Sequence, residues 1–145
     1  MTLINLEKSD VSILGVILAG GQARRMGGID KGRLKIGDAS ILEITTKTLS
    51  FQLDKIILNA NGDQGRFSDL EIQVIPDTIK GYVGPLAGIL SGMRFAEKNG
   101  FTSILTVASD TPFFPADLVS KLSNASAKYN ALISLAATKQ NGKLV

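Results

Sequence analysis

Residues 13–31 read ILGVILAGGQARRMGGIDK, and this stretch decides the fold of the chain. Its first part, residues 13–18, is a nearly unbroken apolar run, which is typical of a strand buried on both faces of a sheet. Two glycine pairs follow, with two adjacent arginines between them and Asp-Lys at the end. Glycines let backbone N–H groups approach an anion closely, and arginine and lysine match phosphate oxygens. The stretch therefore predicts a buried strand that leads into a polyphosphate-binding loop.

Two common phosphate-binding motifs are absent from this loop. Walker A requires a lysine after its last glycine, but Ile29 follows Gly28, and the dinucleotide motif G-x-G-x-x-G does not occur either. Glycines often serve only tight turns. Here they are accompanied by Arg24, Arg25 and Lys31, and clustered cations repel one another unless an anion lies between them. The loop is therefore interpreted as a phosphate site of another kind.

Composition narrows the chemistry that the chain can perform. Its 145 residues are 44% hydrophobic, which predicts one compact domain with a real core. The absence of cysteine excludes disulfides and thiolate metal sites, and the absence of histidine removes the commonest general base. Any reaction must therefore use carboxylates, cations, amides, hydroxyls and backbone dipoles.

Charge and hydropathy limit the partners and the cell compartment that can be expected. The net charge of +3 is too small to argue for nucleic acid as a partner, and no apolar run is long enough to span a membrane. The N-terminal segment is polar and lacks the pattern of a signal peptide, so a cytoplasmic protein is expected. The cations concentrate between residues 24 and 35, opposed there only by Asp30: Arg24, Arg25, Lys31, Arg33 and Lys35.

The rest of the chain alternates apolar runs with turn-forming residues, which predicts an α/β fold. Further strands are expected at residues 55–60, 72–75, 103–108 and 131–136. With helices between them, this order favours an open, mostly parallel sheet with helices on both faces. In such folds, ligands bind beyond the carboxyl ends of the strands.

Three helices are predicted between these strands. Ser40 begins the first and Glu43 completes a capping box, with the expected inward side chains being Ile41, Ile44, Thr45, Thr48, Leu49 and Leu53. The second begins at Pro85 and ends near Asn99-Gly100, with the expected inward side chains being Leu86, Ile89, Leu90, Met93 and Ala96 or Glu97. The third is expected from Pro115 to about Ala127.

Chemically suggestive residues follow three of the predicted strands. The glycine-rich loop follows the first, Asn59-Ala60-Asn61 ends the second, and Asp110 follows the strand at 103–108. Because the carboxyl ends of parallel strands meet at one edge of a sheet, these segments are expected to converge on one site.

Each of these residues also has a plainer structural interpretation. Asn59 and Asn61 are either turn formers or hydrogen-bond partners of a nucleobase or ribose, and Asp77 is either a turn cap or a base or sugar contact. The run 84–88, GPLAG, is either a tight turn into a helix or a place where a helix N-terminus approaches a ligand. Asp110 either holds Mg²⁺, which prefers carboxylate oxygens, or caps a helix or turn that begins at Pro112.

Several of these motifs together resemble the molybdenum cofactor guanylyltransferases, the MobA family. The signature consists of LAGG at 18–21, RMGG at 25–28 and Asp30-Lys31, and NAN at 59–61, GPLAG at 84–88 and DTP at 110–112 match further family motifs in order. The resemblance extends from about Ser12 to Leu118. It implies a three-layer, Rossmann-like nucleotidyltransferase fold of the nucleotide-diphospho-sugar transferase type. Related cytidylyltransferases tend to carry Ala-Ala-Gly where this chain has Ala-Gly-Gly.

The resemblance also implies roles for individual residues. Leu18, Ala19, Gly20 and Gly21 would line the GTP site, and Lys31 would contact the nucleotide. Asn59 and Asp77 would bind the guanosine portion, and Asp110 would bind both GTP and Mg²⁺. Arg25 belongs to the phosphate loop by position. The catalytic groups implied are Arg25, Lys31 and Asp110.

The reaction implied by the resemblance transfers GMP from GTP to molybdenum-loaded molybdopterin and releases pyrophosphate. The nucleophile is then the terminal phosphate of molybdopterin, which is already an anion at neutral pH, so the chain needs no histidine as general base. The implied partners are these two small molecules, together with proteins that deliver molybdopterin or mature molybdoenzymes. Neither nucleic acid nor a membrane is expected as a partner.

The chain departs from the family pattern at its end. Family members continue into a C-terminal segment with an Asn-x-Asn-Thr-Pro-like motif, and none occurs before Val145. We therefore expect residues 1–145 to be a single nucleotidyltransferase domain that lacks the C-terminal part of the family domain, with residues 1–11 as a flexible N-terminal extension. Two alternatives stay open: a non-catalytic GTP-binding relative, and a nucleotidyltransferase that uses CTP or UTP on another phosphorylated acceptor.

Overall fold

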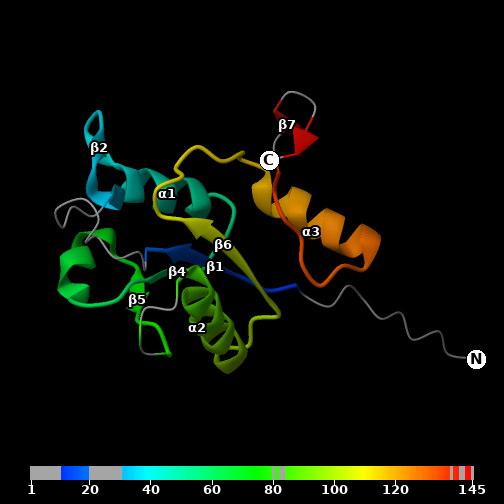
Figure 1. Cartoon of the computed structure of the whole chain (residues 1–145), viewed down its shortest axis with the longest axis horizontal. Helices are drawn as coiled ribbons and strands as arrows, with labels where there is room; N and C mark the ends of the chain where they lie inside the picture. Colours follow the sequence, from blue (N-terminus) through cyan, green and yellow to red (C-terminus); the bar gives the residue numbers. More distant parts are fainter. Residues whose placement is uncertain are drawn as a thin grey trace, which may run out of the picture.

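A parallel four-stranded sheet forms the centre of the computed structural model, which describes residues 11–19, 31–79, 81, 84–137, 139–140 and 143–144 (Figure 1). Its strands are β1 (Ile13–Leu18), β4 (Ile56–Asn59), β5 (Gln73–Ile75) and β6 (Ser103–Ala108). They lie in the order β5-β4-β1-β6, and every neighbouring pair is parallel. The predicted open parallel sheet is therefore confirmed, with the strand before the glycine-rich loop at an inner position.

Helices cover both faces of the sheet, as predicted. The helix α1 (Ile41–Ser50) and the helix α2 (Pro85–Lys98) lie on opposite sides of it (Figure 1). Along β1, Ile17 joins a core with Leu49 of α1 and with Leu118, the first residue of the helix α3 (Leu118–Tyr129). Val16 points the other way and joins a core with Ala96 of α2. This alternation follows from the two-residue period of a strand, and it makes β1 the middle of a three-layer fold.

The helix α1 begins with the capping box that the sequence predicts. The Ser40 hydroxyl accepts from the Glu43 N–H at 3.2 Å, and the Ser40 N–H donates to Glu43 Oε2 at 2.5 Å. Thr45 and Leu49 face inward as expected. The prediction omitted Leu42, which is fully buried.

The inward face of α2 was predicted only in part: Ala96 is buried as expected, but two of the large residues are not. Leu86 and Met93 are 75% and 54% exposed, whereas the buried residues are small ones: Ala87, Gly88, Ser91, Gly92 and Ala96. The reason is the close approach of the helix to the sheet, since a Cβ on Gly92 would lie 2.9 Å from a methyl carbon of Val16. At that separation only small residues fit between the two backbones.

Two further predictions at the C-terminal side need correction. The third helix begins at Leu118, three residues later than Pro115. Residues 131–136 do not form the predicted strand, and Leu132, Ile133 and Leu135 are largely exposed. Apolar content makes a strand only where a neighbouring edge accepts its backbone hydrogen bonds, and in the described part of the chain no strand pairs with these residues.

Short elements complete the described chain. These are the 3-10 turns η2 (Lys31–Arg33) and η3 (Gln64–Leu70), the hairpin of β2 (Lys35–Ile36) with β3 (Ala39–Ser40), and the hairpin of β7 (Lys139–Gln140) with β8 (Lys143–Leu144). Among the described residues, no helix has the length and apolar character needed to cross a membrane.

Candidate functional site

The carboxyl ends of the four strands are tied together at one edge of the sheet. The Ala19 N–H donates to the Asn59 carbonyl at 2.9 Å, and the Ser109 N–H donates to the Leu18 carbonyl at 3.0 Å. On the other side of β4, the Ala60 N–H donates to the Ile75 carbonyl at 3.0 Å. The residues that follow each strand therefore emerge along one line, which is where the sequence places its candidate site residues.

At this edge Asp77 accepts hydrogen bonds from two asparagine side chains. Asn59 Nδ2 donates to Asp77 Oδ1 at 3.0 Å, and Asn61 Nδ2 donates to Asp77 Oδ2 at 2.7 Å. The Asp77 N–H in turn donates to Asn61 Oδ1 at 2.9 Å. Asn59 is 1% exposed, while Asp77 and Asn61 are half-buried. The structure thus brings the three predicted residues into one network, with the carboxylate held from both sides.

The helix α2 packs against this network and restricts its arrangement. A Cβ built on Gly88 would lie 2.2 Å from Asn59 Oδ1, so the amide occupies the space that a larger residue would fill. Three residues later, the buried Ser91 hydroxyl accepts from the Thr78 N–H at 2.8 Å and donates to the Ala87 carbonyl at 2.8 Å. The strand ends and the first turns of α2 therefore hold Asn59 and the chain next to Asp77 in one arrangement.

Asp110 stands apart from this network, two residues beyond β6. Its side chain is exposed, and the Thr111 hydroxyl donates to Asp110 Oδ1 at 3.4 Å. It does not cap α3, because that helix starts only at Leu118, after Asp117. Among the described residues, no three acidic, histidine or cysteine side chains form a group that could hold a metal. One exposed carboxylate suits Mg²⁺ only where substrate phosphates supply further oxygens, which is how Mg²⁺ is usually bound.

The phosphate-loop residues are only partly described. Lys31 is exposed and is the first residue of η2. Directly after η2, the Leu34 carbonyl accepts a hydrogen bond from the Ile41 N–H of α1 at 2.9 Å. The predicted site residues Gly20, Gly21 and Arg25 lie outside the described residues. Leu18 ends β1 and Ala19 follows it directly at the site edge.

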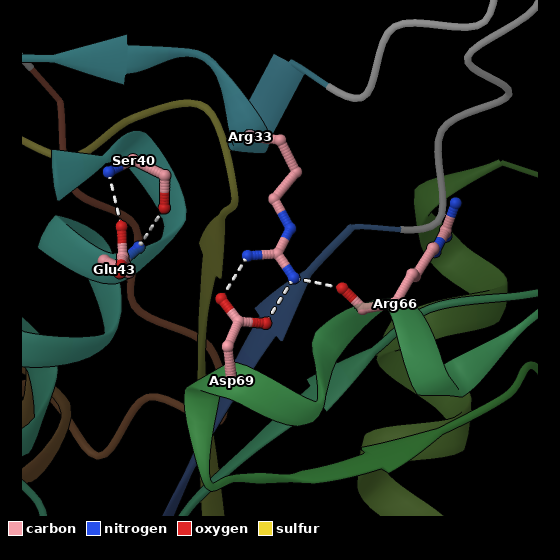
Figure 2. A network of polar contacts seen from close by, with 5 residues as sticks. All are labelled: Arg33, Ser40, Glu43, Arg66 and Asp69. Carbon is pink, nitrogen blue, oxygen red and sulfur yellow. Dashed lines mark hydrogen bonds and ion pairs between the residues drawn. The ribbon is translucent and has the colours of Figure 1, made fainter.

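Arg33 is not part of an unopposed cationic cluster, contrary to the charge pattern of the sequence. Its guanidinium pairs with both carboxylate oxygens of Asp69, each at 2.6 Å, and donates to the Arg66 carbonyl (Figure 2). The hydrogen bond from Arg33 holds the pKa of Asp69 below its usual range. Backbone and hydroxyl hydrogen bonds from Ser40 lower the pKa of Glu43 in the same way. The partner carboxylate lies 36 residues away in sequence, so a local count of charges cannot include it.

Sequence reasoning missed several residues that support the site. Ser91 lies on a face of α2 that hydropathy does not favour as inward, and its small size was the available signal; Gly88 was noted only as part of the run 84–88 and not as a residue that packs against Asn59. Arg66 and Asp69 gave no signal, because nothing in the sequence near η3 indicates that it packs beside η2.

Comparisons with known proteins identify the family of most of the chain. The family model described as MobA-like NTP transferase domain matches residues 15–144. The chain is 42% identical over 127 residues to the molybdenum cofactor guanylyltransferase of Mesorhizobium japonicum, covering 87% of this chain and 61% of that protein. It is 45% identical over 126 residues to the enzyme of the same name from Nitrobacter hamburgensis, covering 86% and 60%.

Solved structures share the fold. A nucleotidyl transferase from Methanothermobacter thermautotroptrophicus has a TM-score of 0.61 at 24% identity, covering 78% of this chain and 57% of its own. A 4-diphosphocytidyl-2C-methyl-D-erythritol synthase from Anaerococcus prevotii has a TM-score of 0.61 at 23% identity, covering 81% and 51%.

The chain spans about three fifths of the length of the curated relatives that it matches. The family match itself covers nearly all of the chain, including most of β1, the glycine-rich segment after it, and the residues Asn59, Asp77 and Asp110. This chain therefore belongs to the family of MobA-like NTP transferase domains.

Proposed function

We propose that this chain binds GTP and transfers its GMP moiety to molybdenum-loaded molybdopterin, with release of pyrophosphate. The observation that carries the proposal is the network of Asn59, Asn61 and Asp77 beside the end of β1. It lies in a chain of the MobA-like family whose curated relatives are named molybdenum cofactor guanylyltransferase. The activity would also involve proteins that deliver molybdopterin or accept the finished cofactor.

The carboxylate of Asp77 suits a guanine base. Each of its oxygens accepts one amide hydrogen bond, and an ionised carboxylate has about four lone-pair sites in total. The sites that these amides do not use can accept from the adjacent N1–H and 2-amino groups of guanine. Cytosine and uracil do not present two donors side by side, so either base would leave an oxygen of the half-buried Asp77 carboxylate without a donor, which disfavours its binding.

The other end of the nucleotide would lie toward Lys31, Arg25 and Asp110. Lysine and arginine stabilise the negative charge that develops on leaving pyrophosphate, and Mg²⁺, when bound, neutralises charge on the phosphates. Asp110 is the carboxylate that would hold the metal, and oxygens of the nucleotide phosphates would be further ligands. Leu18, Ala19, Gly20 and Gly21 would line the passage between the base and the phosphates.

This chemistry needs no general base. The acceptor phosphate is an anion at neutral pH, so the chain has to bring two anions together rather than remove a proton. Positioning and fixed cations do this work, and the chain has 16 lysines and arginines but no histidine.

The first test is nucleotide selectivity in the presence of Mg²⁺. Titration calorimetry on the 145-residue chain is expected to show GTP binding at least about tenfold tighter than CTP or UTP, as expected for charge-assisted hydrogen bonds to the base. Asp77→Asn is expected to reduce this preference, because a carboxamide presents one acceptor where the carboxylate presents two. Equal affinity for the three nucleotides, or preference for CTP or UTP, contradicts guanine recognition by Asp77.

The second part of the test distinguishes the specific roles of Lys31 and Asp110 from a general effect of removing a charged side chain. Lys31→Ala and Asp110→Ala are each expected to lower pyrophosphate release with molybdenum-loaded molybdopterin by about a hundredfold. Lys35→Ala is the matched control, since Lys35 is another exposed lysine four residues along the chain in β2. GTP binding without any pyrophosphate release in the unsubstituted chain would identify a non-catalytic GTP-binding relative instead.

A further inference from the structure

Arg33 joins two segments that lead to opposite ends of the candidate site. It lies two residues after Lys31 in η2, and its guanidinium binds both carboxylate oxygens of Asp69 in η3. The same guanidinium donates to the Arg66 carbonyl (Figure 2). One side chain therefore attaches the segment that follows the glycine-rich loop to η3 through three hydrogen bonds.

Arg66 continues this connection to the nucleoside side of the site. Its guanidinium donates to the Asn61 carbonyl at 3.0 Å, and Asn61 is the residue whose amide holds Asp77 Oδ2. The guanidinium carbons of Arg33 and Arg66 also lie 5.3 and 4.5 Å from the ring centre of Phe67. Phe67 is 1% exposed, so both cations rest on a ring that is anchored in the core.

The exposure of the Arg33–Asp69 pair argues against a mainly stabilising role. The side chains are 28% and 51% exposed, and ion pairs in such positions add little to folding stability because water and salt screen them. The bidentate geometry instead fixes direction, since the planar guanidinium fork matches a carboxylate in one orientation. An ion pair that fixes the relative orientation of η2 and η3 while adding little stability is suited to positioning a neighbouring side chain.

We infer that Arg33 and Asp69 are positioning residues, which hold Lys31 at the distance from the Asn61–Asp77 network that a nucleoside triphosphate spans. The inference rests on the proposed function and deepens it, because it explains how the phosphate end and the nucleoside end of one site keep a common geometry. Arg66 and Phe67 complete the link from η2 to Asn61.

The test compares the binding of GTP with that of GMP by calorimetry with Mg²⁺ present. The ratio of the two dissociation constants isolates the contribution of the β- and γ-phosphates, where Lys31 would act. Arg33→Lys keeps the charge but loses the fork, and Asp69→Asn keeps the shape but loses the charge. Asp117→Asn is the matched control, because the Asp117 carboxylate, 54% exposed against 51% for Asp69, forms an ion pair with Lys121 of α3 at 3.0 Å.

The expected result is that the preference for GTP over GMP falls by about tenfold in Arg33→Lys and in Asp69→Asn and stays unchanged in Asp117→Asn. GMP affinity is expected to match that of the control, and the thermal midpoint at neutral pH is expected to fall only slightly, as for an exposed ion pair. A preference within about twofold of the unsubstituted chain overturns the inference alone, as does an equal loss of GTP and GMP binding with a lowered midpoint, which indicates a structural role. Absence of GTP binding in the unsubstituted chain overturns the proposed function, and the inference with it.

Discussion

At the scale of single residues, the site depends on the close packing of Gly88 against the buried side-chain amide of Asn59. Gly88 leaves the space that Asn59 Oδ1 occupies, and Asn59 in turn donates to Asp77 at 3.0 Å and to the Ile75 carbonyl at 3.4 Å. A buried amide held in this way keeps its orientation only while its neighbours leave room for it. The identity of residue 88 therefore bears on nucleotide binding without any contact with the nucleotide.

Gly88→Ala tests this dependence. The new methyl group would displace the Asn59 amide from Asp77, so GTP affinity is expected to fall by about tenfold. Overpacking costs about 1–3 kcal/mol, offset by about 1 kcal/mol from the better helix propensity of alanine, so the loss of stability is expected to be modest. Calorimetry and urea unfolding measure the two effects.

Gly92→Ala provides the matched control one turn further along α2. A Cβ there would lie 2.9 Å from a Val16 methyl carbon and meets no residue of the polar network. It is expected to cost similar stability while leaving GTP affinity unchanged. Equal GTP affinity in Gly88→Ala and Gly92→Ala would show that the Asn59 amide is not needed for binding.

At the scale of elements, contacts between helices place the segment that follows Asp110. Gln52, two residues after the end of α1, uses both ends of its side-chain amide to hold the start of α3. Its Nε2 donates to the Pro115 carbonyl at 3.1 Å, and its Oε1 accepts from the Val119 N–H at 3.1 Å. One side chain thus satisfies an N–H in the first turn of α3, where Asp117 provides no side-chain cap.

Gln52→Ala is expected to lower the free energy of unfolding by about 1–2 kcal/mol, because two hydrogen bonds of about 0.5–1.5 kcal/mol each are lost. Hydrogen exchange of the Val119 amide is expected to become faster, since that group loses its acceptor. Gln64→Ala, at an exposed glutamine in η3, is the control. Unchanged exchange at Val119 would show that water replaces the glutamine without cost.

At the scale of the whole molecule, two carboxyl groups near η2, those of Asp69 and Glu43, are expected to contribute to the dependence of stability on pH. The pKa of Asp69 is lowered mainly by the hydrogen bond from Arg33, and the pKa of Glu43 mainly by the hydrogen bond from the Ser40 backbone. A carboxyl whose pKa is lower in the folded state contributes stability above its unfolded pKa and loses it as the pH falls through the folded value. Because both carboxylates are exposed, each adds only a little stability at neutral pH, and this small contribution is lost in acid.

Thermal unfolding between pH 7 and pH 3 measures this contribution. The midpoint of the unsubstituted chain is expected to fall as the pH drops below about 4, the ordinary carboxyl range. Asp69→Asn and Glu43→Gln are each expected to flatten that fall, and the double variant to flatten it most. Identical pH profiles for the unsubstituted chain and the double variant would contradict the assignment.

The sequence by itself determined the order of the main elements and the edge of the sheet at which the site lies. The apolar run at 13–18 becomes β1, Ser40 and Glu43 form their capping box, and both Asn59-Ala60-Asn61 and Asp110 follow their strands at the carboxyl edge of the sheet. These features depend on side-chain periodicity, on contacts three residues apart, and on the rule that parallel strands share an edge, all of which are readable along the chain.

Only the tertiary structure decided which face of α2 packs on the sheet and which carboxylate pairs with Arg33. Hydropathy favours Leu86 and Met93 as inward residues, but the close approach of the helix to β1 selects the small side chains at 88 and 92. Asp69 opposes Arg33 from 36 residues away, and residues 131–136, though apolar, have no described strand to pair with. Backbone separation, long-range charge pairing and strand partners are properties of the assembled fold, so no local pattern in the sequence encodes them.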